Sequence, residues 1–105
     1  DAPVTLSVSG GNLALDFARC PFVGVASAAG NVAFTTPSND SGDTHPHTVL
    51  LTVTGAPRDV TAPGYTPVNF GDADTVTLPA GATGTFVFWR IGATKFCFYG
   101  GRTYP

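Results

Sequence analysis

The stretch TFVFWRIGATKFCFYG, residues 85–100, decides the fold that we expect for this chain. Two runs rich in aromatic and β-branched residues flank Gly92-Ala93, and such residues favour β-strands. A two-residue connection that begins with glycine is typical of a type II′ turn between antiparallel strands, so the stretch predicts a β-hairpin. Its expected cross-strand pairs are Ile91 with Thr94, Arg90 with Lys95, Trp89 with Phe96, Phe88 with Cys97, Val87 with Phe98 and Phe86 with Tyr99.

Both faces of this hairpin are apolar. Successive side chains of a strand point to opposite faces. The first face holds Phe86, Phe88, Cys97 and Tyr99, and the second holds Val87, Trp89, Ile91, Phe96 and Phe98. A sheet with one face in water alternates apolar and polar residues, so both faces here need cover. We expect the first face in the core. The second lies under a loop or crossing strand of the same chain, or forms a contact with another copy or a ligand through Trp89, Phe96 and Phe98.

The rest of the sequence also consists of short strand patterns separated by turns. It contains no Glu, Gln or Met and one Lys, but fifteen Thr, eleven Val and eight Phe, so good helix formers are nearly absent. Turn residues recur about every ten positions, as in sandwiches and barrels. We expect a single domain over residues 1–105. Its predicted fold is all-β, an antiparallel immunoglobulin-like β-sandwich of about eight or nine strands with one disulfide. The likeness to antibody domains concerns architecture alone, because Trp89 lies shortly before the second cysteine and not after the first.

The chain carries little charge. Charged residues make up 11% of the sequence and the formal net charge is −2. The five basic residues are scattered and form no patch that would neutralise a phosphate backbone, so we expect no nucleic-acid partner. The longest weakly polar stretch, residues 20–34, is interrupted by Gly, Ser and Asn and is too short for a spanning helix. We therefore expect no membrane span.

Two cysteines, Cys20 and Cys97, and a start at Asp1 without methionine indicate an exported chain. Such a start is typical after removal of a signal peptide, although a trimmed chain would begin in the same way. We expect a secreted, extracellular protein. An even number of cysteines then predicts a disulfide, with two buried free thiols as the alternative. Closing so long a loop would stabilise the fold by about 4 kcal/mol.

The most hydrophilic segment, Pro37–His47, is expected to form a surface loop. It contains the N-glycosylation sequon at Asn39. His45 and His47 lie two residues apart near two aspartates, so a metal site is conceivable, but the further ligands of known zinc spacings are lacking. We therefore predict no metal and no cofactor.

The sequence contains no catalytic constellation. Asp72 and Asp74 lack the ligand series of a calcium loop and indicate an ordinary turn. Both histidines lie in one loop, both cysteines are expected to be oxidised, and no Gly-x-Ser-x-Gly motif occurs. Without Glu, no acid/base carboxylate pair is evident. We predict that the protein is not an enzyme.

Two classes of function fit these features. The first is a structural or self-associating extracellular subunit, such as a filament, coat or decoration protein, held together by the apolar hairpin face. Its N-terminal strand, with Val4, Leu6 and Val8 on one face, would add to a neighbour's sheet unless it pairs within its own chain. The second class is a monomeric secreted binding module. This would be a proteinase inhibitor acting through residues 37–47 or 58–65, or a carbohydrate-binding protein. The aromatic rings available to a glycan are Trp89, Tyr65, Tyr99 and Tyr104, with core packing as the alternative role.

Overall fold

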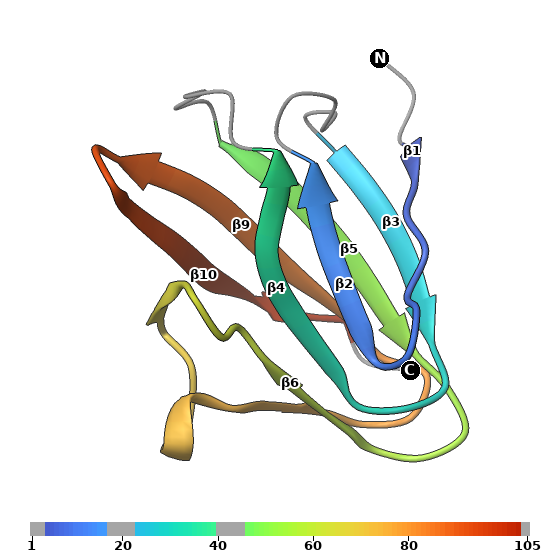
Figure 1. Ribbon diagram of the computed structural model, residues 1–105. Coiled ribbons are helices and arrows are strands. Elements are labelled where there is room, and N and C mark those ends of the chain that lie inside the picture. Colours follow the sequence, from blue (N-terminus) through green and yellow to red (C-terminus); the bar gives the residue numbers. More distant parts are fainter. Residues whose placement is uncertain (1–3, 17–22, 40–45, 104–105) are drawn as a thin grey trace.

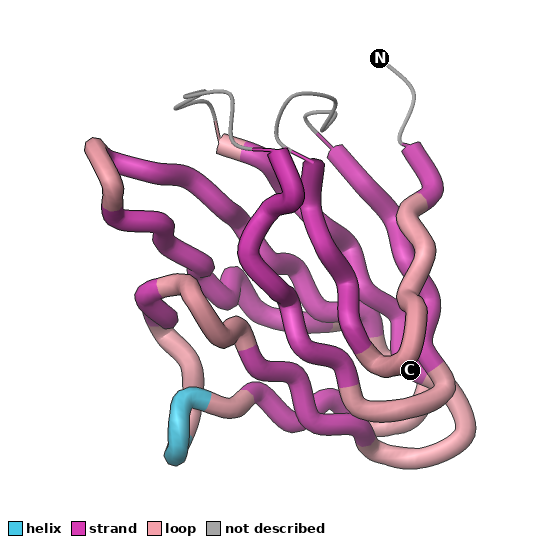
Figure 2. The backbone as a smooth tube through the Cα atoms, viewed as in Figure 1, coloured by secondary structure: helices cyan, strands magenta, loops and turns pink. Residues whose placement is uncertain are grey.

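Two β-sheets stacked face to face make up the computed structural model, which describes residues 4–16, 23–39 and 46–103 (Figures 1 and 2). This part of the chain confirms the all-β prediction, because its only helix is a single 3₁₀ turn, η1 (Asp72–Asp74). The strands are β1 (Val4–Thr5), β2 (Asn12–Asp16), β3 (Val23–Ala28), β4 (Val32–Asn39), β5 (His47–Val53), β6 (Arg58–Thr61), β7 (Thr66–Val68), β8 (Val76–Leu78), β9 (Thr83–Ile91) and β10 (Thr94–Arg102).

The first six strands alternate between the two sheets. Sheet A has the order β1-β3-β5-β9-β10-β7 and sheet B the order β2-β4-β6-β8. Each turn from β1 to β2, from β3 to β4 and from β5 to β6 therefore crosses from sheet A to sheet B, and we call each such pair of strands an arch. The three arches stack in parallel, because β3 pairs parallel with β1 and β5, and β4 pairs parallel with β2 and β6 (Figure 1).

The prediction of an antiparallel immunoglobulin-like sandwich is wrong in its topology, since both sheets are mixed. Among the named strands of the described residues, only β5–β9, β9–β10 and β6–β8 pair antiparallel. The turns at Gly10-Gly11 and Ala29-Gly30 carry the chain to the opposite sheet, whereas a hairpin would return it within the same sheet. Both connections use glycine and join alternating strands, so the local pattern does not distinguish them.

The C-terminal hairpin confirms the predicted register in all six pairs, from Ile91 with Thr94 to Phe86 with Tyr99. Gly92 has φ +60° whereas Ala93 stays outside the left-handed region, as a type II′ turn requires. The hairpin joins the arches through β9, which pairs antiparallel with β5. It therefore extends sheet A beyond the stacked arches.

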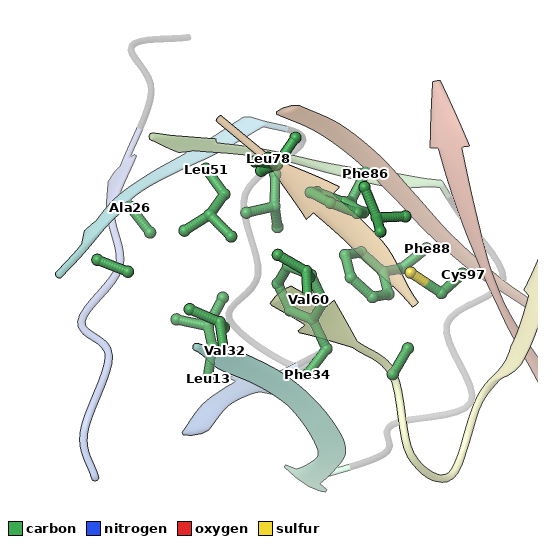
Figure 3. Packing of buried hydrophobic residues seen from close by; sticks show 14 of the residues in the cluster. Leu13, Ala26, Val32, Phe34, Leu51, Val60, Leu78, Phe86, Phe88 and Cys97 are labelled. Atoms are coloured by element: carbon green, nitrogen blue, oxygen red, sulfur yellow. The ribbon is translucent and has the colours of Figure 1, made fainter. Parts of the chain in front are cut away.

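The hydrophobic core lies between the inner faces of the two sheets (Figure 3). Phe34 of β4 packs against Phe86 and Phe88 of β9, with ring centroids 5.0 and 4.9 Å apart. These three rings are fully buried, and each such side chain contributes about 1.5–3 kcal/mol through removal from water. The first hairpin face thus lies in the core, as expected, with Cys97 also buried there.

Candidate functional site: the outer face of sheet A

The second apolar face of the hairpin points away from sheet B. Alternation along β9 and β10 puts the core side chains on the inner face and the remaining apolar ones on the outer face. We call this set the outer patch: Val87, Trp89, Ile91, Phe96 and Phe98. The described residues form two layers, so this side of sheet A has no third layer of described residues over it (Figure 2).

Two aromatic members of the outer patch contact each other across the hairpin. Trp89 stacks on Phe96 across the hairpin, with centroids 5.2 Å apart and ring planes 13° from parallel. Ile91 is 67% exposed and is the one large hydrophobic residue among the described residues that is mostly in solvent. The other members are half-buried by their neighbours within the sheet. Their remaining surface forms a continuous apolar area at the end of sheet A near the hairpin turn.

From the outer patch onto the arches, the outward rows mix aliphatic residues with threonine. Val87 pairs with Thr48 of β5, which pairs with Val23 of β3, and in the next outward row Leu50 pairs with Thr85 on one side and Val25 on the other. Towards the opposite end of these strands, the outward residues become hydroxylic. The outer face of sheet A is therefore apolar at one end and hydroxylic at the other.

Two of the hydroxyl groups at this end bond to each other. Ser27, Thr52 and Thr83 occupy one cross-strand row, and the Oγ1 atoms of Thr52 and Thr83 lie 2.7 Å apart in a hydrogen bond. Hydroxyls bonded to each other lose less on leaving water than unpaired ones. This end of the face is thus compatible with solvent and with a protein contact.

No charged side chain belongs to the outer patch. Arg90 and Lys95 oppose each other near the hairpin turn, but the alternation puts them on the other face of the ribbon. The patch therefore contains no charge that would favour its exposure to water or repel the same patch on a second copy.

The N-terminal strand pairs within its own chain, one of the two alternatives that the sequence left open. β1 lies parallel to β3, and the Leu6 amide donates to the Val25 carbonyl at 2.7 Å. Leu6 and Val8 pack partly against the core, and the side chain of Val4 lies outside what the structure describes. β1 thus forms an edge of sheet A, and the Leu6 amide extends its bonding to β3 by one residue.

Cys97 and His47 lie on the inner face, in one row with Phe88 between them. His47 is 2% exposed, so the part of the prediction that placed it in a solvated loop is wrong. The two residues are separated by two strand spacings, about 10 Å, which is beyond hydrogen-bond reach. Burial raises the pKa of the Cys97 thiol well above its ordinary value of 9.0, which opposes formation of a nucleophilic thiolate.

The tyrosines predicted to contact a glycan pack within the fold where the structure describes them. The Tyr65 hydroxyl donates to the Thr35 carbonyl at 3.1 Å, and its ring is buried. Tyr99 packs against Phe86 with centroids 5.3 Å apart. Tyr104 lies outside the described residues. Of the predicted glycan-contacting rings, Trp89 alone is placed by the described structure on the outer face of sheet A.

The remaining predicted sites are only partly within the described residues. Cys20 and His45 lie outside them, and for Asn39, the last residue of β4, only the backbone is described. Asp72 and Asp74 are exposed in the η1 turn. No three His, Cys, Asp or Glu side chains gather as a metal site in the part of the chain that the structure describes.

The segment proposed as an inhibitory loop, residues 58–65, begins as strand β6 of sheet B. β6 pairs with β4 and β8. The Arg58 side chain lies against the preceding turn, where its Nε and Nη2 donate to the Thr54 carbonyl. In the described ranges, no helix has the length and apolarity needed to cross a membrane.

Sequence reasoning missed the arches and the two edges that they create. One pattern pointed to them: glycine, asparagine, an apolar residue, alanine and an apolar residue occur at 11–15 and again at 30–34. The two copies fall on equivalent turns of the first two arches. The structure shifts their pairing by two residues, so that Leu13 lies beside Phe34, and both side chains stay buried.

Comparison with protein-family models, with curated proteins and with solved structures gave no match for this chain.

Proposed function

We propose that this chain is a non-enzymatic, extracellular structural subunit that self-associates through the outer face of sheet A. The observation that carries the proposal is the outer patch, in which Trp89, Phe96 and Phe98 face away from the core beside the exposed Ile91. A contiguous apolar surface of this kind marks an interaction site in a soluble protein. Aromatic side chains are also the residue class that most often dominates binding energy in protein contacts.

A second copy of the chain suits this surface for two reasons. The patch contains no charged side chain, so two copies can pack face to face without desolvating an unpaired charge. The whole chain has a formal net charge of only −2, so the repulsion between copies is small. A face-to-face contact of one patch with itself is the arrangement found in symmetric dimers.

The proposal includes a disulfide between Cys20 and Cys97. It is supported by the even number of cysteines, and it would require that Cys97, a buried free thiol in the structure, be joined to Cys20. Mass spectrometry of the protein purified without reductant tests it. We expect no alkylation of either cysteine after unfolding, whereas modification of both would contradict the disulfide and weaken the case for secretion.

Light scattering over a range of protein concentrations tests the association. Trp89→Ala removes the central ring of the patch and should weaken self-association about thirtyfold, as expected for an interface hot spot. Ile91→Lys places a charge on an exposed position and should have a similar effect with little cost to folding. The matched control is Thr77→Ala, a change at an exposed position of sheet B, which should leave association unchanged.

A wild-type chain that stays monomeric at high concentration would contradict this proposal. Binding to a glycan array that disappears in Trp89→Ala would then support the carbohydrate-binding alternative, in which the stacked rings of Trp89 and Phe96 form the platform.

A further inference from the structure

A groove opens between the two sheets at the edge of sheet B that is formed by β8. Residues 69–75 run from β7 in sheet A to β8 in sheet B and include the η1 turn, which stands at the rim of the molecule (Figure 2). Between this segment, β8 and β10 lies a groove of about 490 Å³. A groove of this size accommodates a small ligand. The side chains that define its chemistry are those of Asn69, Phe70, Thr75, Thr77, Tyr99 and Arg102.

A β-bulge in β10 puts Arg102 on the same side of the sheet as Tyr99. Tyr99 pairs with Phe86 and Arg102 with Gly84, and these two partners are two residues apart in β9, so they share the inner face. In β10 the same positions are three residues apart, and the extra residue is accommodated by two glycines, of which Gly101 has φ +106°. Without the bulge, Arg102 would point to the opposite face. Bulges next to functional sites often redirect a side chain in this way.

The segment that forms the opposite wall has an unfavourable backbone conformation. Among the described residues, the three non-glycine residues with left-handed φ are Asn69 at +63°, Ala73 at +56° and Asp74 at +52°, and all of them lie in this segment. Residues in such conformations cluster at ligand sites, where the surrounding structure holds them. The Asn69 side chain joins this wall to β10, because its Nδ2 donates to the Tyr99 carbonyl at 2.9 Å. The groove is therefore formed before a ligand arrives.

Two aromatic rings form the apolar part of the groove. Phe70 and Tyr99 each pack against the fully buried Phe86, with ring centroids 6.1 and 5.3 Å apart. Both residues remain half-buried. The core thus holds the two rings in place, and their remaining surface can contact the apolar face of a ligand.

The polar side chains of the groove favour a ligand that has hydroxyl groups. The hydroxyls of Thr75 and Thr77 donate their only hydrogen within the chain, to the Ala73 carbonyl at 3.0 Å and to Asp59 Oδ1 at 2.8 Å. Toward a ligand these two hydroxyls can therefore only accept, and the side-chain oxygen of Asn69 is an acceptor as well. Three such acceptors suit a ligand with several O–H donors.

We propose that the groove binds a uronic acid, a sugar that carries a carboxylate, either free or as a unit of a glycan. Arg102 is the one charged residue among those that line the groove, and its guanidinium pairs with the carboxylate. The sugar hydroxyls donate to the acceptors described above, and the C–H face of the sugar ring lies against Tyr99. Binding here is independent of the proposed self-association, because Tyr99 and Trp89 lie on opposite faces of the hairpin.

Galacturonic acid and its methyl ester test this assignment, since the ester keeps the sugar ring and its hydroxyls but has no charge. In amide NMR titrations up to about 20 mM, we expect the acid to shift the backbone amides of residues 69–77 and 99–102 with a Kd of about 1 mM. The ester should bind about tenfold more weakly because it lacks the carboxylate. Acetate, which has the charge without the hydroxyls, should also bind about tenfold more weakly than the acid.

Variants of the groove test the roles of its side chains. Arg102→Gln should weaken binding of the acid about tenfold and leave binding of the ester unchanged, so that the two ligands become similar. Thr77→Ala removes an acceptor and should weaken binding of the acid, while its self-association stays that of the wild type. Arg58→Gln is the matched control, because Arg58 lies against the turn at Thr54 and outside the groove, and it should bind the acid as the wild type does. The amide spectrum of each variant shows whether it is folded.

Several results would overturn the assignment. These are the absence of shifts at the groove, equal binding of the acid and either acetate or the ester, and unchanged binding of the acid by Arg102→Gln. Shifts around Trp89 in place of the groove would also overturn it and would support the outer patch as a glycan platform. Light scattering of Arg102→Gln separates the two proposals, because Arg102 lies outside the outer patch and its loss should leave self-association unchanged.

Discussion

At the scale of single residues, the burial of Cys97 makes the stability of the fold depend on pH. Its thiol is buried in the folded chain, and burial raises its pKa above the ordinary value of 9.0. Above about pH 9 the unfolded chain therefore releases a proton that the folded chain retains, so unfolding becomes easier as pH rises. We expect the reduced protein to lose about 1.4 kcal/mol of stability for each further pH unit, relative to Cys97→Ala. Urea unfolding of both proteins in reductant between about pH 8 and pH 10 measures the difference.

The same experiment without reductant is the control. In the oxidised protein, a disulfide leaves no thiol to titrate, so the wild type should show no such additional slope. Parallel pH profiles of reduced wild type and Cys97→Ala would show that the Cys97 thiol is not buried as described.

Individual side chains were predictable where alternation fixes the face. The register of the hairpin followed from its turn, and it placed Trp89 and Cys97 on opposite faces, as the structure confirms. His47 was harder to place, because it stands at the boundary between a polar segment and an apolar strand. Its burial depends on its pairing with Phe88 of β9, which is far away in the sequence.

At the scale of elements, β8 and β9 approach each other closely at Gly84. A Cβ atom at this position would lie 3.0 Å from side-chain atoms of Leu78 and Phe86, both fully buried. Gly84→Ala should therefore destabilise the fold by about 1–3 kcal/mol through overpacking. The matched control is Gly100→Ala in β10, where the added carbon would meet nothing nearer than 3.5 Å and the stability should change by less than about 0.5 kcal/mol. Chemical denaturation gives both values, and equal effects would refute the close packing of the two sheets at this point.

Elements were predictable from the sequence, but only some of their partners were. The two strands of the hairpin occur where they were predicted, whereas β1 ends at Thr5, short of the Val4, Leu6 and Val8 alternation that predicted it. The hairpin partner was correct because β9 and β10 are joined by two residues. The partners of β1 to β6 are separated by some twenty or more residues, as in the pairing of Val4 with Gly24, and alternation contains no information on such distant neighbours.

At the scale of the whole molecule, the proposed contact through the outer patch is apolar. No charged side chain is among the residues that define it. We therefore expect the association constant to change by less than about twofold between about 0.05 M and 0.5 M sodium chloride. Ammonium sulfate should strengthen association, because it is excluded from apolar surface. Light scattering in these solutions checks both effects, and marked dissociation by sodium chloride would indicate that charge pairs hold the copies together.

The arches also determine how this protein can change in length. Neighbouring arches are offset by 20 residues between β1 and β3 and by 25 between β3 and β5. Inserting or deleting one arch of 20 to 25 residues would leave a stack that still ends in one edge strand of each sheet. The C-terminal hairpin would stay in place. Chains descended from a common ancestor could thus differ by whole modules while keeping the same terminal ribbon.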